Sequence, residues 1–199
     1  LFVAFVLLVV VSLGAMMWGL ETQRRDALVV NLAGRQRMLA QQMGRLAFEA
    51  GLGEDVTNAA LQEAKQTFNQ TLFALQDGGA APYLSNTTVS LPFTRDPGIR
   101  SALDAVIFAW DDFSNLLDEL QHTPRDDSSF LTKLRSIEEK SSALVTRADE
   151  VVRLYEVDAT SKVNRLRAMQ FTFLVGALIL LGVGAWITRK SALEPLRDL

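Results

Sequence analysis

An arginine-rich stretch, Asn31–Met43, contains residues whose types and spacing are suited to holding an anion. It reads N-L-A-G-R-Q-R-M-L-A-Q-Q-M, and no Asp or Glu occurs from residue 27 to residue 48. Residues three and four positions apart stack along a helix. A helical conformation would therefore gather four residues on one face, namely Gly34, Arg37, Met38 and Gln41.

Two glycines, Gly34 and Gly44, occur where this helix is expected. A glycine inside a helix is less favourable than alanine by about 1 kcal/mol, so each one needs a structural reason. Close approach of a second backbone is such a reason, because the missing side chain lets two helices touch. Arg37, one turn beyond Gly34, would then meet its counterpart across a dimer axis.

The electrostatics of two facing arginines indicate what such a site would bind. Two guanidinium groups roughly 6 Å apart, at an effective dielectric constant of about 20, repel each other by about 3 kcal/mol. A small planar anion between them would remove this repulsion and accept charge-assisted hydrogen bonds from both groups. Two plainer interpretations fit the same residues. Arginine-rich helix faces are usually solvated, and Gly34 would also suit packing against a neighbouring helix of the same subunit.

Other kinds of chemistry find little support in the sequence. The chain has no Cys, which excludes disulfides, thiol nucleophiles and cysteine metal sites. His122 is the only histidine, and we expect it to cap a helix end or face solvent. The acidic pairs at 111–112 and 126–127 are expected to be a solvated face and a helix N-terminus. The phosphate-loop, dinucleotide and zinc spacings are missing. We therefore expect no catalytic residue, no metal and no cofactor, and the net charge of −3 argues against a nucleic-acid partner.

Two apolar runs predict membrane spans that enclose the rest of the chain. Leu1–Leu20 carries no charge and, at about 1.5 Å per residue, spans about 30 Å, the thickness of a bilayer core. Phe171–Thr188 is also uncharged and is followed directly by Arg189 and Lys190. We predict transmembrane helices at 1–20 and 171–188, surrounded by membrane lipid. Positive residues flank the second run on both sides, so the charge pattern leaves the orientation open.

Residues 21–170, between the two runs, show helical periodicity and no strand pattern. The first helix is expected to continue from the membrane to about Ala50, and a second helix to occupy residues 54–76. Asp96 and Pro97 are typical of a helix start, with Asp as the N-cap and Pro at the first helical position. The third helix is expected to run from there to about Gln121.

The fourth helix is expected to begin at Thr123-Pro124 or at Asp126-Asp127 and to continue without interruption into the second membrane span. The connection at 77–95 is interpreted as a loop on the surface. Two long and two short helices predict an all-α fold, an antiparallel four-helix bundle over residues 21–170.

The order of residues in Asn31–Met43 resembles the signature helix of Nar-type nitrate/nitrite sensor kinases. It is closer still to the PilJ-type N-terminal domain of type IV pili chemotaxis transducers, where the motif is similar to N-L-A-G-R-Q-R-M-L. Looser similarity extends through the second helix and the helix of Trp110, over most of residues 21–170. Nar-type kinases differ in having Ser-Leu where this chain has Arg35-Gln36.

This resemblance implies a homodimeric periplasmic sensor domain, in which the two copies of the signature helix pair and nitrate binds between them. Arg37 and Gly34 match the positions that line the family's site. Three further residues next to that face, Asn31, Arg35 and Gln41, are second-rank candidates for binding nitrate or nitrite, and Met38 completes the expected lining.

The last residues, E-P-L-R-D-L, resemble the opening of a HAMP domain, so residues 189–199 are expected to begin a cytoplasmic HAMP segment. Together these features predict a two-pass receptor of the bacterial inner membrane. Its missing output domain, a chemoreceptor or a histidine kinase, would act on cytoplasmic signalling proteins. Two alternatives stay open: the same receptor sensing an organic ligand, or a protein-interaction module with no small-molecule ligand.

Overall fold

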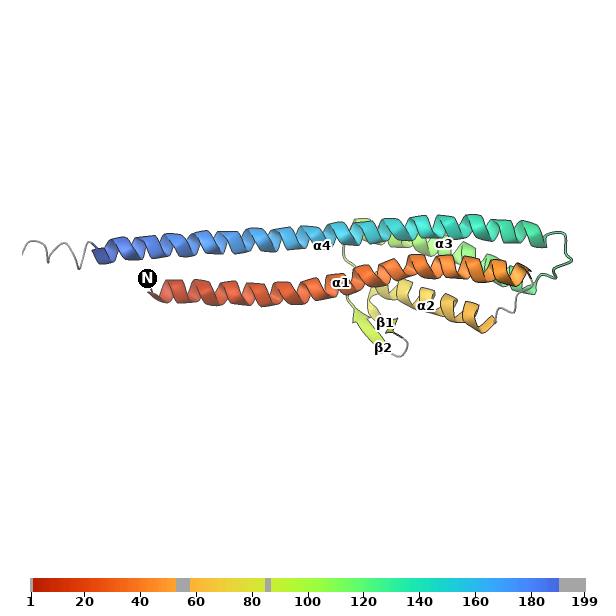
Figure 1. Cartoon of the computed structure of the whole chain (residues 1–199), viewed down its shortest axis with the longest axis horizontal. Coiled ribbons are helices and arrows are strands. Elements are labelled where there is room, and N and C mark those ends of the chain that lie inside the picture. The colour runs from red at the N-terminus through yellow and green to blue at the C-terminus, as the bar shows by residue number, and fades with distance from the viewer. Residues whose placement is uncertain (1, 53–57, 85–86, 190–199) are drawn as a thin grey trace, which may run out of the picture. The chain divides into compact units, whose positions relative to one another are not determined.

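The computed structural model describes residues 2–52, 58–84 and 87–189. Its helices are α1 (Phe2–Leu52), α2 (Asn58–Asp77), α3 (Pro97–His122) and α4 (Phe130–Thr188). Two short strands, β1 (Gly79–Leu84) and β2 (Thr87–Leu91), lie between α2 and α3 (Figure 1). The predicted all-α helical fold is confirmed. The expected HAMP segment lies outside the described residues, apart from Arg189.

The chain divides into two compact units. Residues Arg25–Val157 form the helical bundle, and the second unit combines Leu1–Arg24 with Asp158–Leu199. In the second unit, both helices are long and apolar enough to cross a membrane. A Cβ added at Gly19 would lie 2.8 Å from Cδ1 of Leu166, so the glycine allows α1 and α4 to approach closely there.

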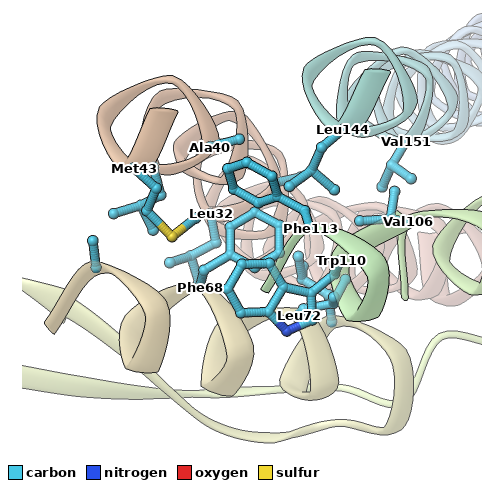
Figure 2. Packing of buried hydrophobic residues seen from close by; sticks show 14 of the residues in the cluster. Leu32, Ala40, Met43, Phe68, Leu72, Val106, Trp110, Phe113, Leu144 and Val151 are labelled. Carbon is cyan, nitrogen blue, oxygen red and sulfur yellow. The ribbon is translucent and has the colours of Figure 1, made fainter. Parts of the chain in front are cut away.

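The core of the bundle is built from the apolar faces of all four helices. Figure 2 shows Leu32 and Met43 from α1 meeting Phe68 from α2 and Phe113 from α3. The rings of Phe68 and Trp110 lie against each other, tilted by 32° with centroids 4.4 Å apart, and the indole Nε1 of Trp110 donates a hydrogen bond to Oδ1 of Asn69. This packing sets which face of α1 is left at the surface.

The start of α3 agrees with the sequence. Asp96 is the N-cap, and its Oδ1 accepts a 2.9 Å hydrogen bond from the backbone N–H of Ile99. Pro97 is the first helical residue, as its fixed φ favours. Its apolar face is buried, including Leu103, Val106 and Phe113, and Ile107 is partly buried.

The start of α4 was predicted too early, because the helix begins at Phe130. Asp127 accepts hydrogen bonds from the backbone N–H and the hydroxyl of Ser129, both at 2.7 Å. These two hydrogen bonds lower the pKa of the Asp127 carboxyl, and the bond from the Ser129 hydroxyl has the larger effect. Such local side-chain bonds compete with helical hydrogen bonds, which explains the turn before Phe130.

The prediction that residues 77–95 form only a loop was wrong. β1 and β2 pair antiparallel, with Gly79 opposite Leu91 and Ala81 opposite Val89. Gly78 has a φ of 79°, and a Cβ there would lie 2.9 Å from the backbone N of Phe93. This glycine turns the chain sharply out of α2. Ala81 and Leu91 are then buried against the bundle, which stabilises a hairpin too short to stand alone.

Candidate functional site

The residues predicted to bind an anion lie on the part of α1 that belongs to the bundle. The opposite face of this segment faces the core, with Leu32, Leu39, Ala40 and Met43 buried. Of the predicted site residues, Asn31, Met38 and Gln41 are exposed, whereas Gly34, Arg35 and Arg37 are half-buried. The packing of the bundle therefore presents the predicted face at the surface.

Two adjoining grooves between α1 and other elements contain all six predicted residues. The first is open, has a volume of about 530 Å³, and is lined on α1 by Gly34, Arg37, Met38 and Gln41. Its other wall is α4, through Val145, Thr146 and Asp149. The second groove brings Asn31 and Arg35 beside the same Gly34, Arg37 and Met38, and adds Tyr83, Val152 and Glu156.

Arg37 makes an ion pair with Asp149 of α4. The distance from Nη1 to Oδ1 is 2.5 Å, and the two side chains keep 42% and 61% of their surface exposed. Asp149 was not among the site residues predicted from the sequence. The signal that would have found it is the spacing of residues 145, 149, 152 and 156, which places them on one face of α4.

Gly34 and Gly44 differ in what surrounds them. A Cβ at Gly44 would lie 2.7 Å from Oγ and 3.1 Å from Cβ of Ser141, so this glycine allows α1 to pack closely against α4 in the same chain. A Cβ at Gly34 would meet one atom within 4 Å among the described residues, outside neighbouring backbone, namely Nη2 of Arg37 at 3.7 Å. That is an ordinary van der Waals distance. Contacts among the described residues therefore explain Gly44 but give no reason for Gly34.

Arg35 holds the hairpin against α1. Its Nη1 donates to the carbonyl of Tyr83 at 2.7 Å and to that of Pro82 at 3.4 Å. Both partners are neutral, so these bonds leave the positive charge of Arg35 beside the second groove. The lining of the two grooves thus carries two arginines, Arg35 and Arg37, and two carboxylates, Asp149 and Glu156.

Gln36 is a polar residue of the same helix that points inward. It is 2% exposed, and neither of its side-chain amide atoms has a hydrogen-bond partner among the described residues. Thr71 of α2 is likewise buried with an unbonded hydroxyl. Sequence reasoning did not separate Gln36 from its neighbours. The signal that Gln36 points inward was its position one turn from Leu32 and Ala40, which are apolar and lie on the buried face of α1.

The residues set aside as unreactive have local structural partners. A ring nitrogen of His122 lies 2.7 Å from the carbonyl oxygen of Asp118, one turn earlier in α3. Asp112 pairs with Lys140 on the bundle surface. Within the described ranges, no group of three His, Asp or Glu side chains is placed to hold a metal ion.

Comparison with known families places these features in context. The family model PilJ, described as the N-terminal region of type IV pili methyl-accepting chemotaxis transducers, matches residues 18–150. This match covers more than half of the chain. It includes every lining residue of the first groove, and those of the second groove except Val152 and Glu156. No curated protein matches the sequence.

Proposed function

The chain belongs to the PilJ family of type IV pili chemotaxis transducer N-terminal domains, and from this premise we propose that its bundle is a sensor for a small inorganic anion. As a member of that family it is a chemotaxis signalling domain. We place the bundle in the periplasm of a bacterial inner-membrane receptor, anchored by two transmembrane helices. Nitrate or nitrite is the proposed ligand.

The observation that carries this proposal is the surface around Gly34. The glycine lies in the interior of α1, where it costs about 1 kcal/mol relative to alanine, yet the described chain offers no close neighbour that requires it. Close approach of a second copy would supply the reason. The half-exposed guanidinium of Arg37 lies beside that position and would face its counterpart.

Each residue of the site has a proposed role. Arg37 of both copies would bind the anion, because a guanidinium carries five N–H donors and its bond to Asp149 uses Nη1. Gly34 would allow the approach of the two helices. Asn31, Met38 and Gln41 would line the contact. Arg35 would add positive potential while holding the hairpin.

The proposed signal passes along the helices. Anion binding would pull the two α1 helices together and change how they pack against α4. Since α4 continues from Phe130 to Thr188, such a change would reach the membrane segment and a HAMP segment beyond it. From there it would act on cytoplasmic signalling proteins through an output domain. Coupling of about 1–3 kcal/mol is typical for two-state switches of this kind.

The test is calorimetric titration of the whole chain in lipid nanodiscs with sodium nitrate, nitrite and chloride. We expect saturable nitrate binding at one anion per two chains, and complete loss of binding in Arg37→Ala. Arg45→Ala is the matched control, because Arg45 lies two turns further on the same helix, is exposed, and pairs with Glu49. Retained affinity in Arg37→Ala, with the chain folded, would refute the site.

A second candidate is an organic ligand in a different groove. A more apolar groove between α1 and α4 is lined by Gly44, Phe48, Leu134, Ser141 and Val145, with Arg45 and Glu138 at its side. These residues would suit an amphipathic molecule such as an amino acid. This function predicts one ligand per chain and no effect of Arg37→Ala, so the same titration separates the two candidates.

A further inference from the structure

Asp149 presents to Arg37 the same kind of group as the proposed ligand. A carboxylate is planar, carries one negative charge, and offers oxygens that match the guanidinium fork, as nitrate does. Asp149 lies on the α4 wall of the groove that contains Gly34, Arg37, Met38 and Gln41. The side chain that would bind the anion is therefore already engaged by an anionic group of its own chain.

The pair is accessible enough to exchange partners. In the single chain, 42% of the Arg37 side chain and 61% of the Asp149 side chain are exposed, and the groove is open. Exposed ion pairs are weak because water competes for both charges. An anion that enters this groove can therefore replace the carboxylate at Arg37.

The other charged groups nearby are engaged differently or lie in the adjoining groove. Arg35 donates to the carbonyls of Pro82 and Tyr83. Glu156 lines the second groove beside Arg37. Glu150 pairs with Arg153 through two hydrogen bonds and lines neither groove. Among these groups, Asp149 is the carboxylate in contact with the proposed ligand-binding side chain.

We infer that Asp149 is a built-in competitor that occupies Arg37 in the absence of ligand and is displaced when the anion binds. This inference rests on the function proposed above and assigns the regulation of that same site. Competition by Asp149 lowers the apparent affinity for the anion. When the anion displaces Asp149, the ion pair that joins α1 to α4 is broken, and α4 is the helix that continues to Thr188.

The test compares nitrate titrations of three variants of the whole chain in nanodiscs. Asp149→Asn keeps the size of the side chain but removes its charge, so we expect nitrate to bind about two- to fivefold more tightly, the range that an exposed ion pair supports. Asp149→Glu keeps the charge and should retain affinity close to that of the wild type. Glu150→Gln is the control, because it makes the same change of net charge one residue away, and it should leave affinity unchanged.

The outcomes separate this inference from the function on which it rests. If the wild type binds nitrate and Asp149→Asn binds equally or more weakly, Asp149 is not a competitor and the inference fails alone. Equal tightening by Glu150→Gln would also overturn it, since the effect would then be one of general charge. If a folded wild-type chain binds no nitrate, the proposed function itself fails and the inference fails with it.

A ligand-free measurement gives a second, independent reading. Thermal unfolding of the wild type, Arg37→Ala, Asp149→Asn and the double variant measures the coupling between the two side chains in a double-mutant cycle. We expect a favourable coupling in nitrate-free buffer that disappears at saturating nitrate. Coupling that nitrate leaves unaltered would overturn the inference.

Discussion

Two glycines ten residues apart on α1 have different surroundings, and the difference distinguishes a packed helix crossing from an open groove. Gly44 lies against Ser141 of α4, whose hydroxyl donates to the carbonyl of Ala40. Gly34 lies at an open groove beside a half-exposed arginine. Among the described residues, Ser141 explains the first glycine, and no comparably close neighbour explains the second. The same helix therefore has a closely packed crossing at Gly44 and an open groove at Gly34.

The largest effect is expected at the packed crossing. Gly44→Val would place its Cβ within 2.7 Å of Oγ and 3.1 Å of Cβ of Ser141, which is buried. We expect overpacking to lower the free energy of unfolding by about 2–3 kcal/mol. Thermal unfolding of the chain in nanodiscs measures this. Adding Ser141→Gly should restore part of the loss, and a variant as stable as the wild type would show that the crossing is not tight.

An intermediate effect is expected where Arg35 joins α1 to the hairpin. Arg35→Leu removes the donor to the carbonyls of Pro82 and Tyr83, one of which is bonded at 2.7 Å. We expect a local loss of about 1 kcal/mol, the net value of such bonds. Hydrogen exchange of β1 and β2 should then accelerate roughly fivefold. If exchange accelerates only in α1 and not in β1 and β2, Arg35 does not hold the hairpin.

The smallest effect is expected at Gly34, and it should have the opposite sign. Gly34→Ala adds a Cβ that meets Nη2 of Arg37 at an ordinary distance, and alanine favours the helix. We expect the free energy of unfolding without ligand to rise by about 0.5–1 kcal/mol. Nitrate binding should nevertheless weaken if a second copy packs here. A stabilised variant with unchanged nitrate binding would show that no second copy packs closely at Gly34.

Much of the fold follows from local rules that act within one helix. The cap at Asp96, the proline after it and the apolar spacing of α3 were each readable, because they depend on neighbours one turn away. The start of α4 was placed wrongly because Asp127 and Ser129 form their own hydrogen bonds. The hairpin was missed because Ala81 and Leu91 form no visible strand pattern, and their burial depends on the bundle beneath them.

In the candidate site, too, some features could be predicted from the spacing along one helix and others depend on tertiary packing. The helical spacing alone placed Gly34, Arg37, Met38 and Gln41 on one face, and the groove they share agrees with this. Arg35 was predicted as a second-rank ligand, and its hydrogen bond to the hairpin could not be foreseen from the sequence. Sequence reasoning also treated Gly34 and Gly44 alike, although only the position of Ser141 distinguishes them.

The helical class, the two apolar runs and the arginine-bearing face of α1 next to a glycine were predictable, because they depend on composition and on the period of one helix. Which glycine is packed, where Arg35 is held and the pairing of Asp149 with Arg37 depend on how the helices pack against one another. Asp149 is 112 residues from Arg37 along the chain. A contact across such a distance is set by the register of α4 against α1, which only the packing of the whole core determines.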